Sequence, residues 1–289
     1  MKSICFFNHY HNGDLFASKA FIKEITESID TKFYYAHCNH PLVLSDLNLV
    51  YTNALEIDHK TKFLDLENVV YVNTWIGSYF TDEKSAEECC TLNFSYNMFS
   101  QIYSELNKIF SSNLKLSPIQ EYFPSIDFSK FQIKEIDKYI KFDKNKKILF
   151  CNGPIMSGQC SYTGDMKDVI ESLSKKYPNN SFICTHKFNT DQENIKFTAD
   201  IIKINGCDLN EIGYLSTFCD IIVGRNSGPH CFTANKVNIN DPNKTFYAFG
   251  QDPRVSLYYQ MDLNCYFVYE VFDNLETIKF SIEELILKL

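Results

Sequence analysis

A polar turn that follows a short apolar run has the residue types of an anion-binding site. Residues 221–223 are Ile-Ile-Val, which predicts a buried strand, and a glycine ends the run. The next six residues are Arg-Asn-Ser-Gly-Pro-His, and a helix-compatible segment follows. Free N–H groups at a helix start attract anions, and open α/β sheets bind ligands at the carboxyl ends of their strands. The turn therefore predicts a phosphate or diphosphate site. An ordinary strand-turn-helix connection is the alternative.

Arginine usage favours the anion hypothesis. Only two of the 28 basic residues are arginine, Arg225 and Arg254. The planar guanidinium group suits bidentate contact with phosphate oxygens, so an arginine directly after a buried strand has a plausible ligand. The candidate residues for binding this phosphate or diphosphate are Lys187, Arg225, Asn226, Ser227, Gly228 and His230.

A second polar turn lies between the predicted first strand, residues 3–7, and the predicted first helix, and it contains Asp14. The carboxylate there would face a ligand at the strand ends and could accept a proton from an attacking hydroxyl, as a general base does. The alternative is that Asp14 caps the helix, which would occupy the same oxygen atoms. The other residues of this turn are candidate contacts to a sugar or acceptor: His9, His11, Asn12 and Gly13.

Two further side chains follow predicted strands. Lys187 comes shortly after residues 181–184, where it could neutralise a leaving diphosphate or be a solvated surface lysine. Trp75, the single tryptophan, follows the strand predicted at residues 69–72. Its ring could stack on a sugar or acceptor, whereas core packing is the more common role of a tryptophan.

Histidine and cysteine spacing does not indicate a metal site. No cysteine or carboxylate at the spacing of a zinc site completes a set with His9, His11 and His230. The chain also has no Asp-x-Asp sequence that could bridge a metal to a diphosphate. We therefore expect neither a metal nor a cofactor.

Composition limits the function classes. The net charge of −8 argues against a nucleic-acid partner, which would need a basic stripe. No apolar run approaches the roughly 18 residues of a membrane span, and the first residues lack the pattern of a signal peptide. Eleven cysteines without a secretory signal predict free thiols in a reducing compartment. We expect a cytoplasmic protein, and a peripheral contact with a membrane stays open.

Alternating strands and helices must position these residues. Strands are predicted at residues 3–7, 32–37, 69–72, 147–151, 181–184, 201–204, 221–223 and 245–249, and helices near 15–29, 98–110, 166–173, 209–215 and 274–287. Residues 112–146 lose the pattern and predict a connector. The fold class is therefore α/β, with two Rossmann-like domains facing across a cleft. The expected domains are residues 1–140, linker included, and 141–289, with the last helix a candidate to cross back to the first domain.

The two polar turns resemble those of bacterial heptosyltransferases and, more broadly, of inverting glycosyltransferases of the two-Rossmann GT-B architecture. That family opens with a strand, a Gly-Asp turn and a helix, and here the turn is Gly13-Asp14. Its second domain carries an Asp-Ser/Thr-Gly-Pro-x-His turn after a helix and a strand, and here residues 226–230 are Asn-Ser-Gly-Pro-His. Two departures are Asn226 in place of the aspartate and the loss of one residue before His230.

The resemblance implies that Asp14 is the general base and that Ser227 and Gly228 hold the donor's diphosphate. The first domain would then serve the acceptor and the second the nucleotide-sugar. The implied activity is a hexosyl- or heptosyltransferase that moves a sugar to a hydroxyl of a glycan or glycoconjugate, with inversion and without metal. The departure at Asn226 means that a heptose donor is not implied. A sugar-nucleotide epimerase of the same fold and a non-catalytic nucleotide- or glycan-binding protein are the alternatives.

Overall fold

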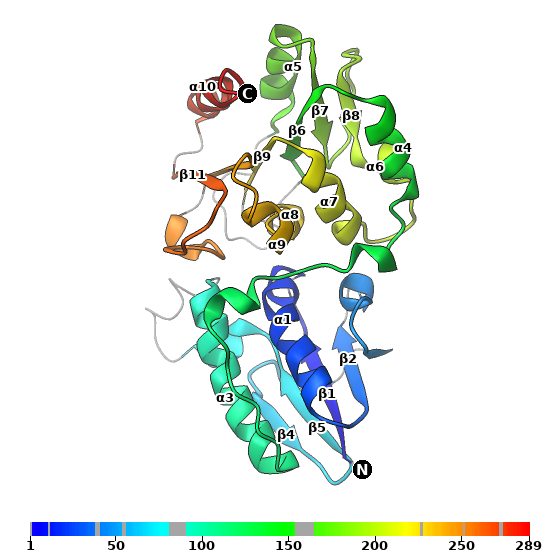
Figure 1. Ribbon diagram of the computed structural model, residues 1–289, viewed down its shortest axis with the longest axis vertical. Helices are drawn as coiled ribbons and strands as arrows, with labels where there is room; N and C mark the ends of the chain where they lie inside the picture. The colour runs from blue at the N-terminus through cyan, green and yellow to red at the C-terminus, as the bar shows by residue number, and fades with distance from the viewer. Residues whose placement is uncertain are drawn as a thin grey trace. The chain divides into compact units, whose positions relative to one another are not determined.

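The computed structural model describes residues 2–10, 12–37, 41–53, 56–80, 91–153, 165–225, 228–250, 252–271 and 274–289. The chain divides into two compact units. The first comprises Met1–Ser125 and Arg254–Gln260, and the second comprises Ile126–Pro253 and Met261–Leu289. Each unit is built on its own sheet (Figure 1).

The first unit has a five-stranded sheet in the order β3-β2-β1-β5-β4. Its strands are β1 (Ser3–Asn8), β2 (Phe33–His37), β3 (Val50–Thr52), β4 (Phe63–Asp65) and β5 (Val69–Asn73). Neighbouring strands are parallel, except that the edge strand β4 runs antiparallel to β5. The strands predicted at residues 3–7, 32–37 and 69–72 are confirmed. The sequence pattern does not predict β3 and β4, because a three-residue strand is too short to show a period.

Two long helices belong to this unit, α1 (Asn12–Ser28) and α3 (Leu92–Phe110). Phe21 of α1 stacks between the rings of Phe99 and Tyr122, with centroid distances of 4.4 and 4.1 Å. Thr91 caps α3 by accepting a hydrogen bond from the N–H of Phe94, so this helix begins earlier than its apolar spacing predicts. The remaining helical turns are η1 (Pro41–Leu44), η2 (Ile76–Tyr79) and η3 (Ile119–Tyr122).

The second unit has a six-stranded parallel sheet in the order β11-β10-β9-β6-β7-β8. Its strands are β6 (Lys146–Cys151), β7 (Asn180–Cys184), β8 (Ile195–Phe197), β9 (Ile221–Gly224), β10 (Thr245–Phe249) and β11 (Tyr266–Glu270). Taken in chain order, this is the 3-2-1-4-5-6 order of a Rossmann fold. The prediction of two Rossmann-like α/β domains is therefore confirmed at the level of the two sheets.

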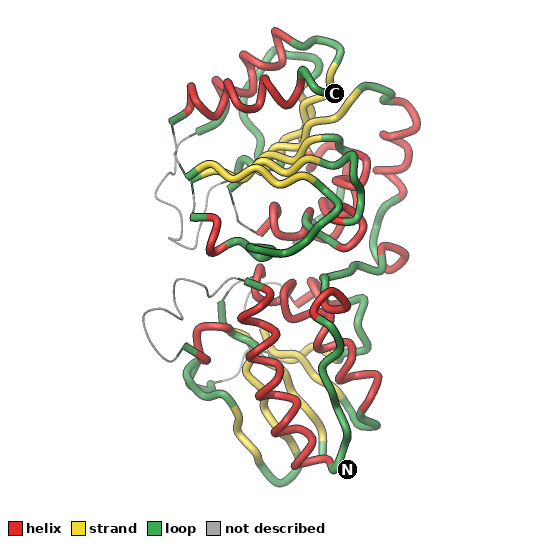
Figure 2. Tube along the Cα trace, turned by 60° about the vertical axis from the view of Figure 1, so that its left-hand side comes forward, coloured by secondary structure: helices red, strands yellow, loops and turns green. Residues whose placement is uncertain are grey.

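Seven α-helices are described in the second unit: α4 (Lys134–Phe142), α5 (Lys167–Lys176), α6 (Thr198–Ile202), α7 (Leu209–Leu215), α8 (Gly228–Thr233), α9 (Lys236–Ile239) and α10 (Leu275–Ile286). Its described 3₁₀ turns are η4 (Phe128–Lys130) and η5 (Ser216–Phe218). The turn η6 (Pro253–Val255) begins in the second unit and ends in the first. Helices cover both faces of this sheet (Figure 2). Among the described residues, no helix is long and apolar enough to cross a membrane.

Two predictions about these elements are wrong. The strand predicted at residues 201–204 is the end of α6, because a pair of buried isoleucines suits a short helix as well as a strand. The connector predicted at residues 112–146 contains α4, which buries Ile136 completely. The charged residues of that segment form the solvent-facing side of the helix, which sequence analysis interpreted as a linker.

The units divide between Ser125 and Ile126, earlier than residue 140. The segment 126–142 packs within the second unit, where the ring of Phe128 lies 5.0 Å from that of Tyr214. The last helix, α10, is part of the second unit, and Lys176 on α5 forms an ion pair with its Glu283 at 3.0 Å. The segment that joins the first unit from the C-terminal half is Arg254–Gln260.

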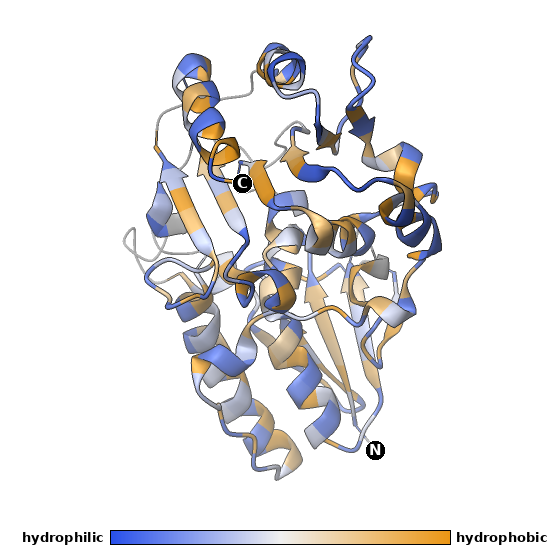
Figure 3. Ribbon diagram, turned by 45° about the horizontal axis from the view of Figure 1, so that its top comes forward, coloured by the Kyte–Doolittle hydropathy of each residue, from blue (hydrophilic) through white to orange (hydrophobic). Residues whose placement is uncertain are grey.

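The core of each unit lies along its central strands. In the second unit, Ile148 and Phe150 of β6 and Ile221 and Val223 of β9 are fully buried and pack with residues of α5 and α10. Figure 3 shows strands that are mostly hydrophobic and helices that carry both hydrophobic and hydrophilic residues. Strands covered on both faces are expected to be continuous apolar runs, which is why the sequence reveals most of them.

Candidate active site

Asp14 follows the carboxyl end of the central strand of the first unit. β1 ends at Asn8, and Asp14 is the third residue of α1. The side chain is partly buried, and burial raises the pKa of its carboxyl group from 3.8 to about 7. Within the described residues this carboxyl group forms no hydrogen bond or ion pair, so it caps no described N–H group. A desolvated carboxyl group that titrates near neutral pH is suited to general base catalysis.

Two buried amide side chains lie close to Asp14 in the chain. Asn8 is fully buried, and its Oδ1 accepts a hydrogen bond from the N–H of Tyr10 at 2.8 Å. Neither Asn8 Nδ2 nor Asn12 Oδ1 has a hydrogen-bond partner among the described residues, although both atoms are buried. Buried polar atoms without a hydrogen-bond partner are rare in native proteins, because each one lowers the stability of the folded state. They mark this end of β1 as a place where polar groups of a ligand would be accommodated.

A pair of buried hydroxyl groups lies on the neighbouring strands. The phenol oxygen of Tyr35 on β2 is 3.0 Å from Oγ1 of Thr74, which follows β5. The N–H and the hydroxyl of Thr74 both donate to the carbonyl of Phe7, at 2.9 and 3.2 Å. Burial raises the pKa of Tyr35 well above its usual value, and the negative charge of Asp14 adds to this effect. Neither residue is expected from the sequence as part of a site, because Tyr35 has the pattern of a strand residue and Thr74 that of a residue in the turn after a strand.

The other candidates of this turn have different surroundings. His9 is partly buried, and its Nε2 lies 2.9 Å from the carbonyl oxygen of Ile57. Asn12 and Gly13 are partly buried in the first turn of α1. His11 lies outside the described residues. The contacts of these residues with a sugar or acceptor stay a prediction.

Trp75 belongs to a cluster of aromatic rings. Its indole lies 4.3 Å from the ring of Tyr10 and 5.4 Å from that of His59, measured between centroids. The indole also covers Gly77, where an added Cβ would meet it at 2.3 Å. Trp75 is only partly buried, so it is not a core tryptophan, and the cluster offers a partly exposed aromatic surface beside the ends of β1 and β5.

In the second unit, the strand order reverses between β6 and β9, which is where Rossmann folds bind their ligands. Arg225 directly follows β9 at this point, but its side chain is only 2% exposed. One terminal amine, Nη2, donates a hydrogen bond to the carbonyl of Gly153 at 3.3 Å, which ties the end of β9 to the residues after β6. The guanidinium group is therefore buried against the protein, and its contact with a diphosphate stays a prediction.

A pair of hydrogen bonds connects the ends of β6 and β7. Asn152 is 93% buried, its Nδ2 donates to the carbonyl of His186 at 3.0 Å, and its Oδ1 accepts from the N–H of His186 at 2.9 Å. An added Cβ at Gly153 would lie 4.0 Å from the Cβ of His186. Arg225, Asn152 and their partners thus connect three adjacent strand ends.

Lys187 is exposed, as one of the two sequence interpretations predicted. Its ammonium group forms an ion pair with Asp200 on α6 at 2.5 Å, and both side chains are more than half exposed. An exposed ion pair of this kind contributes at most about 1 kcal/mol. A stronger anion could therefore displace Asp200 at little cost.

His230 lies on α8 and is buried, which lowers its pKa to about 4 and keeps the imidazole neutral. Its Nε2 has no hydrogen-bond partner among the described residues. The imidazole packs against Gly224 at the end of β9, where an added Cβ would lie 3.0 Å from His230 Cδ2 and 2.8 Å from the Cβ of Cys151. Only a glycine at position 224 allows this close approach.

Of the remaining candidates of the donor turn, the structure describes only Gly228. Gly228 is the first residue of α8, and an added Cβ there would lie 3.9 Å from Leu209 on α7. Asn226 and Ser227 lie outside the described residues. Glu211, also on α7, is a buried carboxyl group that the sequence analysis missed; burial raises its pKa, and it accepts a hydrogen bond from the N–H of Gln132 at 3.3 Å.

Within the part of the chain that the structure describes, no group of three His, Cys, Asp or Glu side chains could hold a metal ion. The described cysteines are free thiols. His9 and His230 belong to different units, and each packs against residues of its own sheet.

Comparisons with known proteins identify the fold. No protein-family model and no curated protein matches the sequence. The crystal structure of the glycosyl transferase family 9 protein from Veillonella parvula DSM 2008 matches 98% of this chain and 89% of its own, with a TM-score of 0.52 and 10% identity. The chain has a GT-B-like fold. At this identity the likeness establishes the fold, and the chemistry has to be argued from the residues of the site.

Two other solved structures match at a lower score. The match to E. coli ADP-heptose LPS heptosyltransferase II covers 100% of this chain and 99% of that protein, with a TM-score of 0.49 and 12% identity. The match to the UDP-GlcNAc 2-epimerase from Neisseria meningitidis, bound to UDP-GlcNAc, covers 99% of this chain and 91% of that protein, with a TM-score of 0.49 and 13% identity.

Proposed function

We propose that the protein is a nucleotide-sugar-dependent glycosyltransferase of hexosyl or heptosyl type, which inverts the anomeric carbon and needs no metal. The observation that carries this proposal is Asp14, a desolvated carboxyl group with a pKa of about 7 that follows the central strand of a GT-B-like chain. The buried, unpaired amide atoms of Asn8 and Asn12 support a ligand site beside it.

In the proposed reaction, Asp14 takes the proton of an acceptor hydroxyl while the hydroxyl oxygen attacks the anomeric carbon of the donor. The bond from this carbon to the diphosphate oxygen breaks, and the diphosphate leaves with the electron pair. Attack from the side opposite the leaving group inverts the anomeric carbon. A base with a pKa near 7 is largely deprotonated at slightly alkaline pH and is stronger than an ordinary aspartate.

The second unit supplies the proposed donor site, with Asn226, Ser227, Gly228 and His230 around the diphosphate. Lys187 would exchange its ion pair with Asp200 for a phosphate oxygen. Arg225 would act from its buried position, through its charge and by holding the Gly153 carbonyl in place. Positive charge at the leaving diphosphate is what a metal ion would otherwise supply.

The aromatic cluster of Tyr10, His59 and Trp75 is the proposed surface for the reacting end of the acceptor, a glycan or glycoconjugate. Aromatic rings bind the C–H face of a sugar through their apolar surface. His9, His11, Asn12 and Gly13 would contribute polar contacts nearby.

The proposal is tested by replacing Asp14 with asparagine. A thermal-shift screen of nucleoside diphosphates and nucleotide-sugars first identifies the donor, because a ligand at a hundred times its Kd stabilises by roughly 2.7 kcal/mol. Sugar transfer and nucleotide affinity are then measured for the wild type, for Asp14→Asn and for the control Asp30→Asn, an exposed aspartate of the same unit. We expect Asp14→Asn to lose at least about 10²-fold in turnover and to retain nucleotide binding, as for loss of a general base.

Several outcomes would contradict the proposal. Full turnover in Asp14→Asn would show that Asp14 is not the general base. A loss of activity with EDTA would show that the reaction requires a metal. A product that retains the donor's configuration would exclude the inverting mechanism. Interconversion of a nucleotide-sugar with its epimer in the absence of any acceptor would identify an epimerase, and ligand binding without turnover would identify a binding protein.

A further inference from the structure

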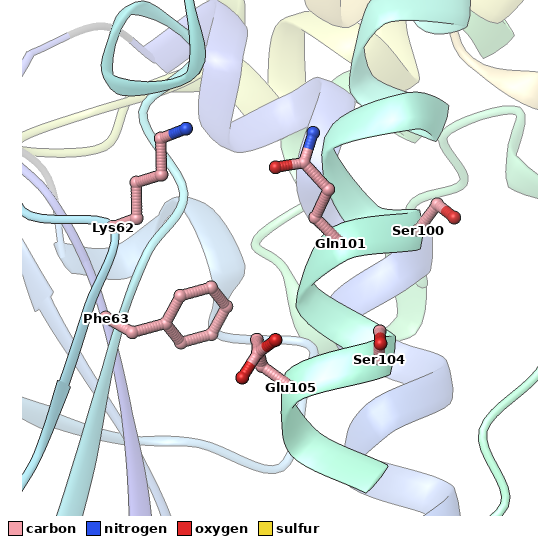
Figure 4. Close-up of a pocket in the computed structure, with 6 residues that line it drawn as sticks. All are labelled: Lys62, Phe63, Ser100, Gln101, Ser104 and Glu105. Atoms are coloured by element: carbon pink, nitrogen blue, oxygen red, sulfur yellow. The ribbon is translucent and has the colours of Figure 1, made fainter. Parts of the chain in front are cut away.

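A groove on the first unit lies apart from the residues discussed so far. It is formed by the edge strand β4 with the residue before it on one side and by the exposed face of α3 on the other, and it encloses about 480 Å³ (Figure 4). This volume is within the range of small-molecule sites. Its lining residues are Lys62, Phe63, Ser100, Gln101, Ser104 and Glu105.

The side of the groove that α3 forms is polar, because the polar residues of this helix recur at helical spacing. Residues 100 and 104 are one helical turn apart, and so are residues 101 and 105, which places all four on one side of α3. Met98, Phe99 and Ile102 are buried in the core on the other side. The groove therefore meets two hydroxyl groups, an amide and a carboxylate, and Glu105 is paired with Lys108 at 2.6 Å.

The strand side is fixed and carries an aromatic ring. The carbonyl of Lys62 accepts a hydrogen bond from the N–H of Asn73 at 2.9 Å, and its ammonium group lies 5.1 Å from the centre of the Tyr79 ring. Phe63 is paired with Val72 of β5, and its ring is partly buried. Figure 4 shows the Phe63 ring extending from the strand toward α3 and the ends of Lys62 and Gln101 facing each other above it.

The chemistry of this lining selects one class of ligand. The lining has one ammonium group, Lys62, which lies over the Tyr79 ring, and it has no arginine that could bind phosphate oxygens in a bidentate way, which argues against a phosphate or sulfate. Hydroxyl, amide and carboxylate groups along a whole side argue against an acyl chain. An aromatic ring opposite several hydrogen-bonding groups matches a sugar, which has an apolar C–H face and a rim of hydroxyls.

We propose that this groove binds a neutral sugar unit of the acceptor, so that the acceptor is an oligosaccharide and not a single sugar. This inference rests on the proposed function. Phe63 lies beside Val72 of β5, and Val72 lies beside Phe6 of β1, so the groove is two strands, or about 10 Å, from the strand that leads to Asp14. One sugar unit in the groove and another at Asp14 would therefore belong to one chain of a few sugars.

The experiment measures binding and turnover separately on the full chain. An array of neutral hexose and N-acetylhexosamine oligosaccharides of different lengths identifies a ligand, and calorimetry then gives its Kd. We expect Phe63→Ala and Gln101→Ala to weaken binding at least tenfold, and Phe63→Trp, which keeps an aromatic surface, to preserve it. Asn97→Ala, an exposed change on α3 outside the groove, is the control and should bind like the wild type.

With the donor in hand, Phe63→Ala should raise KM for the oligosaccharide at least tenfold and leave kcat unchanged, because the groove is remote from the reacting atoms. Wild-type Kd and KM in all groove variants would overturn the inference even if transfer occurs, and so would an array on which no neutral oligosaccharide binds. Groove-dependent binding without transfer to the bound glycan would overturn the acceptor assignment and the proposed transferase, leaving a glycan-binding groove.

Discussion

The polar residues at the carboxyl ends of the two sheets are used in different ways. In the first unit, Asp14 has no hydrogen-bond or ion partner among the described residues, and Trp75 is partly exposed. In the second unit, Arg225 is buried on the carbonyl of Gly153, His230 is buried and neutral, and Lys187 is paired with Asp200. The position after a parallel strand therefore indicates which polar side chains belong to a candidate site, but it does not predict whether such a side chain is exposed or is buried in contacts with the protein.

The largest expected effect concerns the buried guanidinium group. Arg225→Ala removes the hydrogen bond to Gly153 and leaves a cavity between the ends of β6 and β9. We expect the free energy of unfolding to fall by about 2–4 kcal/mol. Lys187→Ala is the exposed counterpart and should change it by less than about 1 kcal/mol. Denaturant unfolding measures both, and similar small losses for the two variants would erase the contrast between a structural and a surface cation.

A smaller effect is expected from two glycines at opposite ends of one turn. Gly224→Ala places a methyl group 2.8 Å from the Cβ of Cys151 and 3.0 Å from His230, which we expect to cost about 1–3 kcal/mol of unfolding free energy. Among the described residues, the added methyl group of Gly228→Ala meets nothing closer than Leu209 at 3.9 Å, so this variant should stay within about 1 kcal/mol of the wild type. Thermal unfolding of both variants makes the comparison. Equal stability would show that His230 does not need to pack on the end of β9.

The smallest effect is a pH dependence of stability that comes from Asp14. Its pKa is about 7 in the folded chain and 3.8 for an unperturbed aspartate, so the unfolded chain loses this proton first and the folded state is destabilised as pH rises from about 4 to 7. Asp14→Asn removes the penalty. The difference between 3.8 and about 7 corresponds to at most about 4 kcal/mol, and water around this partly exposed carboxyl group reduces it. We expect the variant to be more stable than the wild type by on the order of 1–2 kcal/mol at pH 8, and equally stable below pH 4. Denaturant unfolding of both proteins at pH 8 and below pH 4 measures this difference. A variant that is less stable than the wild type at pH 8 would contradict the burial of the charge.

Most of the fold could be predicted from the sequence. The central strands of both sheets are continuous apolar runs, and the α-helix at 275–286 has a clear apolar period. The strands β3, β4 and β8 could not be predicted, because each has three residues and depends on pairing with a neighbour. The misassigned segment at residues 201–204 shows that two isoleucines do not distinguish a strand from a short helix.

The site was predictable in its location more than in its contacts. The turn that holds Asp14 follows a recognisable strand and precedes a recognisable helix, so its position at the strand end could be predicted. The pairing of Tyr35 with Thr74 joins residues on different strands, and the bond from Arg225 to Gly153 joins two loops. These contacts depend on the strand order of each sheet, which the local sequence does not contain.

The central claim is that the first unit keeps a desolvated carboxyl group for a substrate proton. It is tested most directly by NMR titration of the protein labelled with ¹³C at the aspartate carboxyl carbons, with the Asp14 resonance assigned by its loss in Asp14→Asn. We expect this resonance to titrate with a pKa of about 7. A pKa near the 3.8 of an unperturbed aspartate would show that the carboxyl group is well solvated, and would contradict the role of Asp14 as a general base poised near neutral pH.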